Sequence, residues 1–351
     1  MAFLPASFHR FFIKLFNWEY WPFNVVYTPI YFYWFYLCIK ARAVFFINTA
    51  NPSIRNGGFL MESKKEIYDL IPQQYYPLTI ICSPQQSIES IQNSLLQKAM
   101  QLPLIAKPDI GMRGMQVKLV KTIDELKAYN ANTKVPYLLQ NYIAYENEVG
   151  IFYYKYPNEK MGAISGIVAK EFLNIVGDGQ HTIAALLAMN SRFALQIPAL
   201  QKLYGNQLQQ ILPAGELRTL VPYGNHSRGA KFIDITSKNN QDLTQVINTI
   251  CNAIDGFYFG RLDIKYNTWE QLCKGENMAI IEVNGAGSEP THMYDPAHSI
   301  FFAWKEIIRH LDILYKISVA NKKSKNLSFM TFKEGMQMLQ NNKQQVKLIS
   351  Q

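Results

Sequence analysis

The spacing of hydrophobic residues predicts alternating helices and strands from about residue 56 onward. In DLTQVINTICNAI, apolar side chains between Leu243 and Ile254 recur every three or four positions, as on one face of a helix. The stretch LPLIAKPDIGMRGMQVKLV has the pattern of a strand, a glycine loop and a second strand. TIDEL has the Thr-x-x-Glu spacing of a capping box, so a helix should begin near Thr122. Further strands are expected over 136–143, 148–156 and 161–173.

A period of two predicts two strands that carry polar side chains on one face. In FYFGRLDIKY, Arg261, Asp263 and Lys265 alternate with apolar residues. In MAIIEVNG, Glu282 and Asn284 alternate with apolar residues, and we expect Ile281 and Val283 behind them. If these strands pair, Asp263 faces Glu282, and the two carboxylates need cations between them. Oxygen ligands suit Mg²⁺ held jointly with nucleotide phosphates, so Asp263, Glu282 and Asn284 form a candidate metal site.

The glycine loop KPDIGMRG offers both a cation and exposed backbone for a phosphate. Lys107 lies at the end of a predicted strand, and Gly111 and Gly114 allow backbone N–H groups to approach a phosphate closely. An ordinary hairpin is the competing interpretation of this loop. The distant acidic cluster favours the phosphate site.

Composition limits the protein class. The 351 residues are enough for two or three modest domains, and 48% hydrophobic against 17% charged residues excludes a disordered chain. The four cysteines lack metal-type spacing, and His292 and His298 lack a third ligand, so we expect reduced thiols and no zinc site. The net charge of +9 is not gathered into one basic motif. We therefore expect no nucleic-acid partner, and the charge suits an anionic membrane or a phosphate-bearing substrate.

The N-terminus is unusually aromatic. Residues 1–60 hold 19 of the 47 Phe, Trp and Tyr residues, and 20 uncharged residues separate Glu19 from Lys40, about the length that spans a bilayer. Pro22 and Pro29 would break or kink such a helix, and Trp and Tyr prefer the headgroup interface. Four basic residues flank the segment and could meet anionic headgroups: Arg10, Lys14, Lys40 and Arg42.

Three interpretations of this segment stay open. It attaches to the membrane interface, it packs on the core of the protein or of a partner, or it spans the membrane. No cleavable signal is evident, because no short aliphatic stretch precedes a small-residue cleavage site. We expect a cytoplasmic protein associated peripherally with the inner face of the membrane.

The order of these motifs resembles the ATP-grasp superfamily, most closely the D-alanine–D-alanine ligase-like carboxylate–amine ligases. That pattern has a lysine that opens a helix, a Lys-Pro with a glycine flap, a hinge ending in an acid, and strands with Arg-x-Asp and Glu-x-Asn. The counterparts here are Lys64 in MESKKEIYDLIP, Lys107, Glu148 in LLQNYIAYENEVGI, the GRLDIKY strand and the IIEVN strand. The resemblance covers roughly residues 60–318.

The resemblance implies how ATP and metal would be held. Lys64 and Lys107 would contact the phosphates under a flap over 109–115 that includes Gly111, Arg113 and Gly114. Segment 139–143, with Gln140, Asn141 and Tyr142, would line the adenine, and Glu148 would hold the ribose. The three oxygen ligands would bind two Mg²⁺ ions, which Mn²⁺ could replace.

The resemblance also implies catalytic roles. Arg261 would steady the acyl-phosphate or the tetrahedral intermediate. Lys170 in GIVAKEF is either a further phosphate contact or a surface lysine on a strand. VGDGQHTI is similar to a segment of the cyanophycin-synthetase-like branch. The loop LVPYGNHSRGAKF contains His226, Arg228 and Lys231, and it either approaches the acceptor substrate or is a solvated turn.

Three departures from the family pattern bear on the substrates. Positions 140–141 lack the frequent hinge acid, so adenine recognition would depend more on backbone groups. After Asn284 the loop reads Gly-Ala-Gly-Ser-Glu-Pro, so we expect an altered substrate pocket that includes Gly287 and Ser288. Only about 60 residues precede Lys64, which leaves the usual preceding domain reduced or missing.

We therefore expect an α+β protein with the ATP-grasp fold, in which two α+β subdomains grip ATP. The expected parts are an aromatic helical N-terminal segment at the membrane interface (1–55), an N-terminal subdomain with the flap (56–143), a C-terminal subdomain with the metal and substrate site (144–318) and a basic tail (319–351). Six lysines against one acid, Glu334, favour a solvated, partly flexible tail over a binding arm.

The expected activity is ATP-dependent amide or peptide bond formation between a carboxylate and an amine through an acyl-phosphate. A kinase that phosphorylates a small molecule and a membrane-attached nucleotide-binding scaffold without catalysis are the alternatives. The substrates would be small molecules or peptides, and a homodimer is left open.

Overall fold

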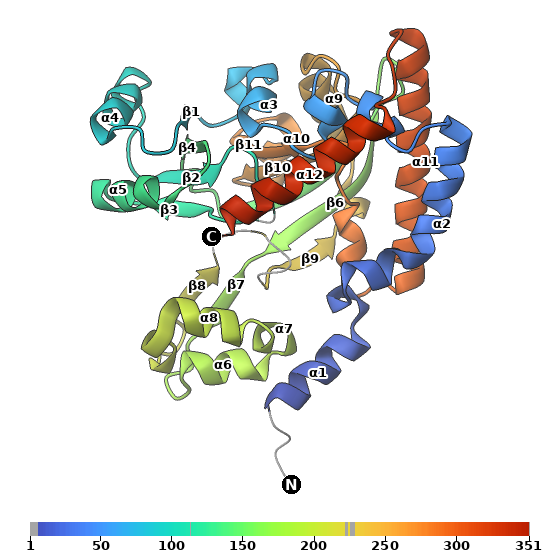
Figure 1. Ribbon diagram of the computed structural model, residues 1–351. Helices are drawn as coiled ribbons and strands as arrows, with labels where there is room; N and C mark the ends of the chain where they lie inside the picture. Colours follow the sequence, from blue (N-terminus) through green and yellow to red (C-terminus); the bar gives the residue numbers. More distant parts are fainter. Residues whose placement is uncertain (1–5, 113, 222–223, 225–228, 351) are drawn as a thin grey trace.

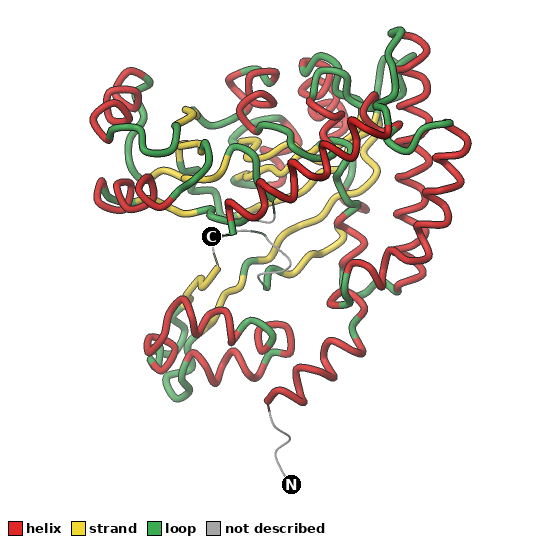
Figure 2. The backbone as a smooth tube through the Cα atoms, in the orientation of Figure 1, coloured by secondary structure: helices red, strands yellow, loops and turns green. Residues whose placement is uncertain are grey.

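The computed structural model describes residues 6–112, 114–221, 224 and 229–350 (Figure 1). It confirms the expected α+β class, because helices and antiparallel sheets are both present (Figure 2). The smaller of the two main sheets has the strand order β1-β4-β2-β3, with β1 over Thr79–Cys82, β2 over Leu104–Pro108, β3 over Lys118–Val120 and β4 over Tyr137–Asn141. Helices α4 (Ile88–Gln97) and α5 (Ile123–Asn132) bury their apolar side chains against this sheet. Thr122 caps α5 as expected, since its hydroxyl accepts a hydrogen bond from the backbone N–H of Glu125.

The larger sheet has the strand order β11-β10-β5-β6-β9, and every neighbouring pair is antiparallel. Its strands are β5 (Asn147–Tyr154), β6 (Ala163–Glu171), β9 (Lys231–Asp234), β10 (Phe259–Tyr266) and β11 (Met278–Asn284). One face packs on α3 (Lys64–Leu70), α9 (Gln241–Ala253) and α10 (Trp269–Lys274) through a buried apolar cluster. Its other face carries the polar side chains of β10 and β11 and, beside them, the buried Phe152 and Phe259.

A small lobe interrupts the larger sheet between β6 and β9. It contains a two-stranded sheet of β7 (Leu173–Val176) and β8 (Leu217–Val221) and the helices α6 (Ile183–Met189), α7 (Ser191–Ala194) and α8 (Ile197–Tyr204). Its apolar side chains form their own buried cluster. Figure 1 shows this lobe below the main sheets.

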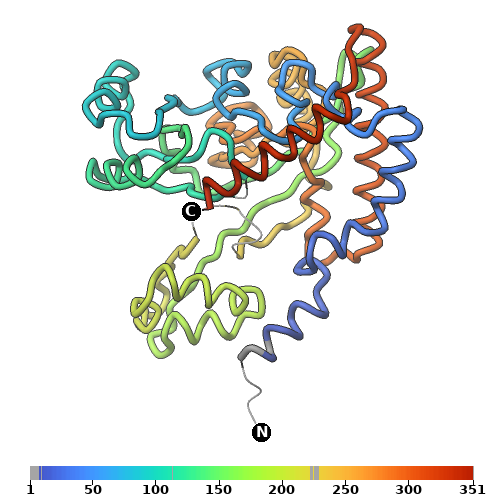
Figure 3. Tube along the Cα trace, viewed as in Figure 1, coloured from blue at the N-terminus to red at the C-terminus, as the bar shows by residue number. Residues whose placement is uncertain are grey.

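The aromatic N-terminus forms α1 (Ala6–Phe16) and α2 (Phe23–Ala41), and α2 packs along α11 (Ile300–Ser324) (Figure 3). Val26, Ile30 and Leu37 of α2 are buried. Leu37 belongs to a cluster that also holds Ile317 of α11 and Phe259 of β10. The inner face of α2 is therefore part of the protein core. In the described part of the chain, no helix combines the length and the apolar character that crossing a bilayer requires.

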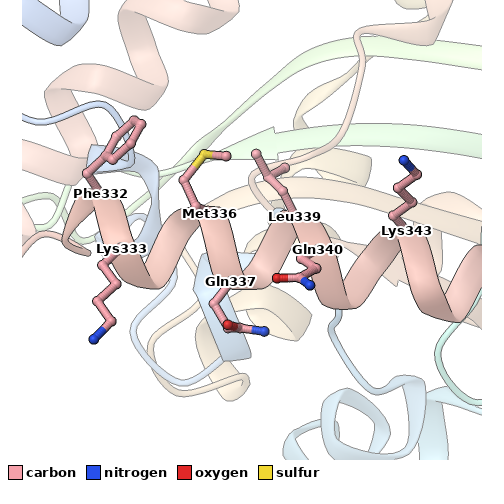
Figure 4. A pocket seen from close by; sticks show the side chains of 7 residues that line it. All are labelled: Phe332, Lys333, Met336, Gln337, Leu339, Gln340 and Lys343. Carbon is pink, nitrogen blue, oxygen red and sulfur yellow. The ribbon is translucent and has the colours of Figure 1, made fainter.

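The expectation of a partly flexible basic tail is wrong for residues 332–349, which form the helix α12 (Phe332–Ile349). Thr331 and Glu334 make a complete capping box at its start. Phe45 pairs with Met330 just before the helix, and Ile349 is buried near its end. Seven α12 side chains line a surface hollow that shares no residue with the polar cluster described below, so it is not the candidate site (Figure 4): Phe332, Lys333, Met336, Gln337, Leu339, Gln340 and Lys343.

Candidate functional site

Strands β10 and β11 pair as the sequence predicts, with Asp263 opposite Glu282 and Arg261 opposite Asn284. The register then shifts, because Ile264 pairs with Ile280. Ile281 is thus an extra residue in β11, and a bulge of this kind is common next to functional sites. The expectation that Ile281 packs behind the strand is wrong, since Ile280 and Val283 fill the core there and Ile281 is only partly buried.

Asp263 lies at the centre of a buried charge network. Its carboxylate accepts two hydrogen bonds from Arg261, at 2.9 and 3.0 Å, and Lys170 Nζ lies 3.1 Å from Oδ1. Burial alone would raise the pKa of Asp263, but Arg261 and Lys170 stabilise its charged form and lower the pKa to about 2. Lys170 also pairs with Glu148 at 2.7 Å, and both are buried. The surface interpretation of Lys170 is therefore wrong.

Gly150 on β5 makes room for this network. A Cβ atom there would lie 3.1 Å from Asp263 Oδ1 and 3.2 Å from Arg261 Cδ. Any larger residue would press on the paired carboxylate and guanidinium. The sequence analysis missed Gly150, although its place two residues after Glu148 on a strand puts it on the polar face.

Lys107 connects the two main sheets. Its buried Nζ donates to Tyr68 Oη at 2.9 Å, to Gln140 Oε1 at 2.9 Å and to the Ile281 carbonyl at 3.0 Å. Burial lowers the pKa of Lys107 to about 7. The side chain of Gln140, which we expected beside the adenine, hydrogen-bonds to Lys107 and to Thr79 Oγ1, and its contact with adenine stays a prediction.

Lys64 opens α3, as expected, and its ammonium bridges the flap and β11. Nζ lies 2.9 Å from the Gly111 carbonyl oxygen and 3.3 Å from Glu282 Oε1. Burial would lower the pKa of Lys64, but the carboxylates of Glu282 and Glu62 outweigh it and raise the pKa. Ser63 caps α3 and donates a 2.9 Å hydrogen bond to Asp109 Oδ1 at the base of the flap. The flap and the start of α3 are therefore held together beside the acidic pair.

The remaining predicted ATP contacts that the structure describes, at Asn141, Tyr142 and Gly114, are not part of the charge network. Asn141 Oδ1 is buried and meets no hydrogen-bond donor in the described part of the chain, and Tyr142 is 38% exposed. Gly114 has a φ of +66°, which glycine adopts readily in a tight turn of the flap. Arg113 lies outside the described residues.

The predicted acceptor loop is described only in part, since His226 and Arg228 lie outside the described residues. Gly224 is described, and a Cβ atom there would lie 2.3 Å from Lys170 Cδ and 2.8 Å from Glu148 Oε1. Gly224 therefore lies against the buried Lys170–Glu148 pair. Lys231 lies on β9, where its Nζ is 3.9 Å from the exposed Glu171, so it does not join the network.

The loop after Asn284 is fastened to the N-terminal segment, which the sequence analysis did not predict. The backbone N–H groups of Ala286 and Gly287 donate to the carbonyls of Gly57 and Gly58 at 3.0 and 2.8 Å. A Cβ atom on Gly58 would lie 2.6 Å from Gly285 Cα, so the contact requires glycine.

The next two residues of this loop, Ser288 and Glu289, also make side-chain hydrogen bonds. The Ser288 hydroxyl donates to the carbonyl of Asn284, at 2.8 Å, so it stabilises the turn after β11. The carboxylate of Glu289 accepts hydrogen bonds from Tyr27 of α2, at 2.5 Å, and from Tyr294, at 3.2 Å. The N-terminal helix therefore contributes a side chain to the loop beside the candidate site.

The acidic residues fit the expected metal ion in type. Among the described residues no three His, Cys, Asp or Glu side chains are grouped as metal ligands. A metal site here would use two carboxylates and an amide. Mg²⁺ is commonly held by one or two carboxylates with substrate phosphates as the other ligands. Asn284 Nδ2 and Glu62 Oε2 are buried and meet no partner in the described part of the chain, which leaves polar positions for a ligand.

No protein-family model matches the sequence, and a sequence search among curated proteins finds no match. The fold is similar to solved structures at low sequence identity. A bifunctional glutathione synthetase from Pasteurella multocida matches at 17% identity and a TM-score of 0.38, over 75% of this chain and 38% of that chain. A D-alanine–D-alanine ligase from Bacillus anthracis matches at 13% identity and a TM-score of 0.42, over 75% of this chain and 68% of that chain.

A third match, the D-cycloserine synthetase DcsG, has 11% identity and a TM-score of 0.38 over 74% of this chain and 69% of that chain. This chain thus spans well under half of the glutathione synthetase and about two thirds of the other two structures.

Proposed function

We propose that this protein is an ATP-dependent ligase that joins a carboxylate to an amine through an acyl-phosphate. The observation that carries the proposal is the convergence of Lys64, Lys107, Lys170 and Arg261 on the acidic residues of β10 and β11. Four buried or half-buried cations match a polyphosphate, and the acidic residues match the metal ion that accompanies it.

Each cation has a defined place in this proposal. Lys64 and Lys107 would bind ATP phosphates between the flap and β11, and Lys170 would add a third phosphate contact. Arg261, fixed by Asp263, would stabilise the negative charge that develops on the acyl-phosphate and the tetrahedral intermediate. Because these groups are already held by neighbours, little reorganisation would be needed when charge develops.

Asp263, Glu282 and Asn284 would hold two Mg²⁺ ions, for which Mn²⁺ could substitute. When bound, the metal neutralises phosphate charge and orients the γ-phosphate. The phosphates would replace Glu282 as the partner of Lys64, which leaves oxygen atoms of that carboxylate for the metal.

The reaction would proceed in two steps. A carboxylate oxygen of the substrate attacks the γ-phosphorus and ADP leaves. The amine nitrogen then attacks the carbonyl carbon, phosphate leaves with the C–O bonding pair, and the amine loses one proton. A kinase would stop after transfer of the phosphoryl group to a hydroxyl.

A vestigial scaffold explains the network poorly. Removing one partner of a buried ion pair costs about 3–5 kcal/mol, and replacing a whole pair by apolar residues is often neutral or stabilising. A chain whose nucleotide site had decayed would gain nothing from Glu148, Lys170, Asp263 and Arg261 beyond what apolar residues supply, whereas a scaffold that still binds nucleotide differs from a ligase only in ADP release. The buried charges are therefore better explained by a ligand that they bind.

The decisive experiment measures ADP release with ATP, Mg²⁺ and a panel of carboxylates and amines, offered singly and together. We expect release only when both substrate classes are present. Glu282→Gln should abolish ADP release. Asp124→Asn should not, because the Asp124 side chain is 89% exposed on α5. Release with a hydroxyl compound alone would identify a kinase. The proposal would be overturned if the protein neither released ADP nor bound an ATP analogue under any condition.

A further inference from the structure

Helix α2 has a second face that the protein core does not cover. Phe32, Phe35 and Ile39 are 76%, 60% and 78% exposed. They are spaced by three and four residues, so they form one stripe along the helix. Tyr36 and Val25 are also exposed on this helix. The outward face of α2 is thus as apolar as the inward face that packs on α11.

Such a stripe is unusual for a surface helix, which normally turns charged and polar residues to water. Large exposed apolar patches mark sites that bind a protein, a ligand or a membrane. Helix α1 also exposes aromatic side chains, namely Phe11 and Phe16. The question is which partner covers the α2 stripe.

The charge around the stripe identifies an anionic partner. Glu19 is the only acid in residues 1–55, and it is buried in an ion pair with Arg192 at 2.6 Å. Lys14, Lys40 and Arg42 are exposed and have no carboxylate partner in the described part of the chain. Lys40 ends the stripe, with its Nζ 5.5 Å from the centre of the Tyr36 ring.

A second copy of this chain fits the stripe less well. Two α2 faces brought together would place basic side chains near each other, and the segment offers no accessible carboxylate to pair with them. An anionic lipid surface matches both the apolar stripe and the basic side chains, because it has an apolar layer for the aromatics and phosphates for the cations.

We propose that the outward stripe of α2, from Val25 to Ile39, docks flat on an anionic membrane surface. Its aromatic side chains and Ile39 enter the boundary between headgroups and acyl chains, and Lys40 and Arg42 meet lipid phosphates. This inference does not depend on the ligase activity, because it uses no residue of the charge network.

The structure dictates how the proposal must be tested. Deleting residues 1–50 would also remove Leu37, Phe46 and Ile47, which are fully or almost fully buried in the core. The truncated protein would then aggregate for reasons unrelated to lipid. The test therefore uses the full chain with surface substitutions.

The variants are Phe32→Ser combined with Phe35→Ser and Ile39→Ser, and Lys40→Ala combined with Arg42→Ala. Leu96→Ser is the matched control, because Leu96 is 80% exposed on α4. Each protein is sedimented with phosphatidylglycerol vesicles and with phosphatidylcholine vesicles. Circular dichroism and light scattering in the absence of lipid confirm folding and oligomeric state.

The intact chain should sediment with phosphatidylglycerol vesicles. The apolar triple variant should need at least tenfold more lipid, and the basic double variant roughly 30-fold more at low salt. Leu96→Ser should match the intact chain. Failure of the intact chain to bind, or unchanged binding by the folded triple variant, would overturn the proposal. A dimer that the triple variant converts to a monomer, without vesicle binding by the intact chain, would assign the stripe to a second copy instead.

Discussion

The hydroxyl of Tyr27 donates a 2.5 Å hydrogen bond to Oε1 of Glu289. This bond joins α2 to the loop that directly follows the Glu282–Asn284 pair. Burial would lower the pKa of Arg261, but Asp263, Glu282 and, with the smallest effect, Glu289 together raise it. A residue of the aromatic segment therefore helps to hold the loop beside the candidate site.

Tyr27→Phe should perturb substrate binding and leave nucleotide binding intact. The hydroxyl holds Glu289 in place, and losing one hydrogen bond to a charged group costs about 1.5–3 kcal/mol. We expect the KM for the substrate to rise about tenfold or more, with unchanged affinity for an ATP analogue measured by calorimetry.

Tyr31→Phe is the matched control for that change, because Tyr31 lies one turn further along α2 and is exposed. Equal effects of the two substitutions would mean that the change acts on α2 in general rather than on Glu289.

Lys107→Met should weaken binding of an ATP analogue by roughly 10- to 150-fold, the value of a charge-assisted hydrogen bond. In the free protein, burial lowers the pKa of Lys107 to about 7, and bound phosphates would favour its charged form. The affinity of the intact protein should therefore fall as the pH rises from 6 to 9. Calorimetry across this range should show a smaller slope in the variant. An unchanged affinity would make the glycine loop an ordinary turn.

Helix α12 should influence the flap. Gln345 Nε2 donates a 2.9 Å hydrogen bond to the Ile110 carbonyl, and a Cβ atom on Gly111 would lie 3.8 Å from Ile349 Cδ1. Gln345→Ala should raise the KM for ATP several-fold, since the flap loses a support. Gln337→Ala on the same helix should not, because the Gln337 side chain donates its hydrogen bond to Asn341 of α12 and not to the flap. If the KM for ATP stayed the same in both variants, α12 would have no influence on the flap.

Glu306 should contribute to stability in a defined pH range. Burial would raise its pKa, but hydrogen bonds from His292 and Arg309 lower it from the ordinary 4.5 to about 2. A group with a lowered folded-state pKa stabilises the fold above its unfolded pKa, so this contribution is complete above about pH 5 and is lost as the pH falls towards 2. Its full size is roughly 3 kcal/mol.

Urea unfolding between pH 5 and pH 2 checks this expectation. Glu306→Gln should make the free energy of unfolding less dependent on pH in this range. Glu270→Gln, an exposed carboxylate on α10, is the control. Equal slopes in the Glu306 variant and the intact protein would contradict the assignment.

The parts of the site that could be predicted are those encoded by local periodicity. Asp263 and Glu282 could be placed opposite each other because each lies on a strand whose apolar residues alternate with polar ones. Lys64 could be placed at a helix start only through the resemblance of MESKKEIYDLIP to the family pattern, and the structure shows that Ser63 caps this helix.

The parts that could not be predicted depend on contacts between distant segments. The bulge at Ile281 needs one extra residue in β11, which no pattern within MAIIEVN reveals. The hydrogen bond from Lys107 to Gln140 joins β2 to β4, and no local pattern in either strand predicts it. The helical tail and its contact with the flap also depend on where α11 ends.

The packing of α2 on α11 has a consequence for synthesis of the chain. Helix α2 ends at Ala41, whereas α11 starts at Ile300, so the aromatic helix leaves the ribosome long before its partner exists. At about 5–20 residues per second, this interval lasts tens of seconds. During that time both faces of α2 are exposed. We expect ribosome-bound chains arrested before Ile300 to bind vesicles or chaperones more strongly than the finished protein, so the order of translation itself would favour delivery to the membrane before folding is complete.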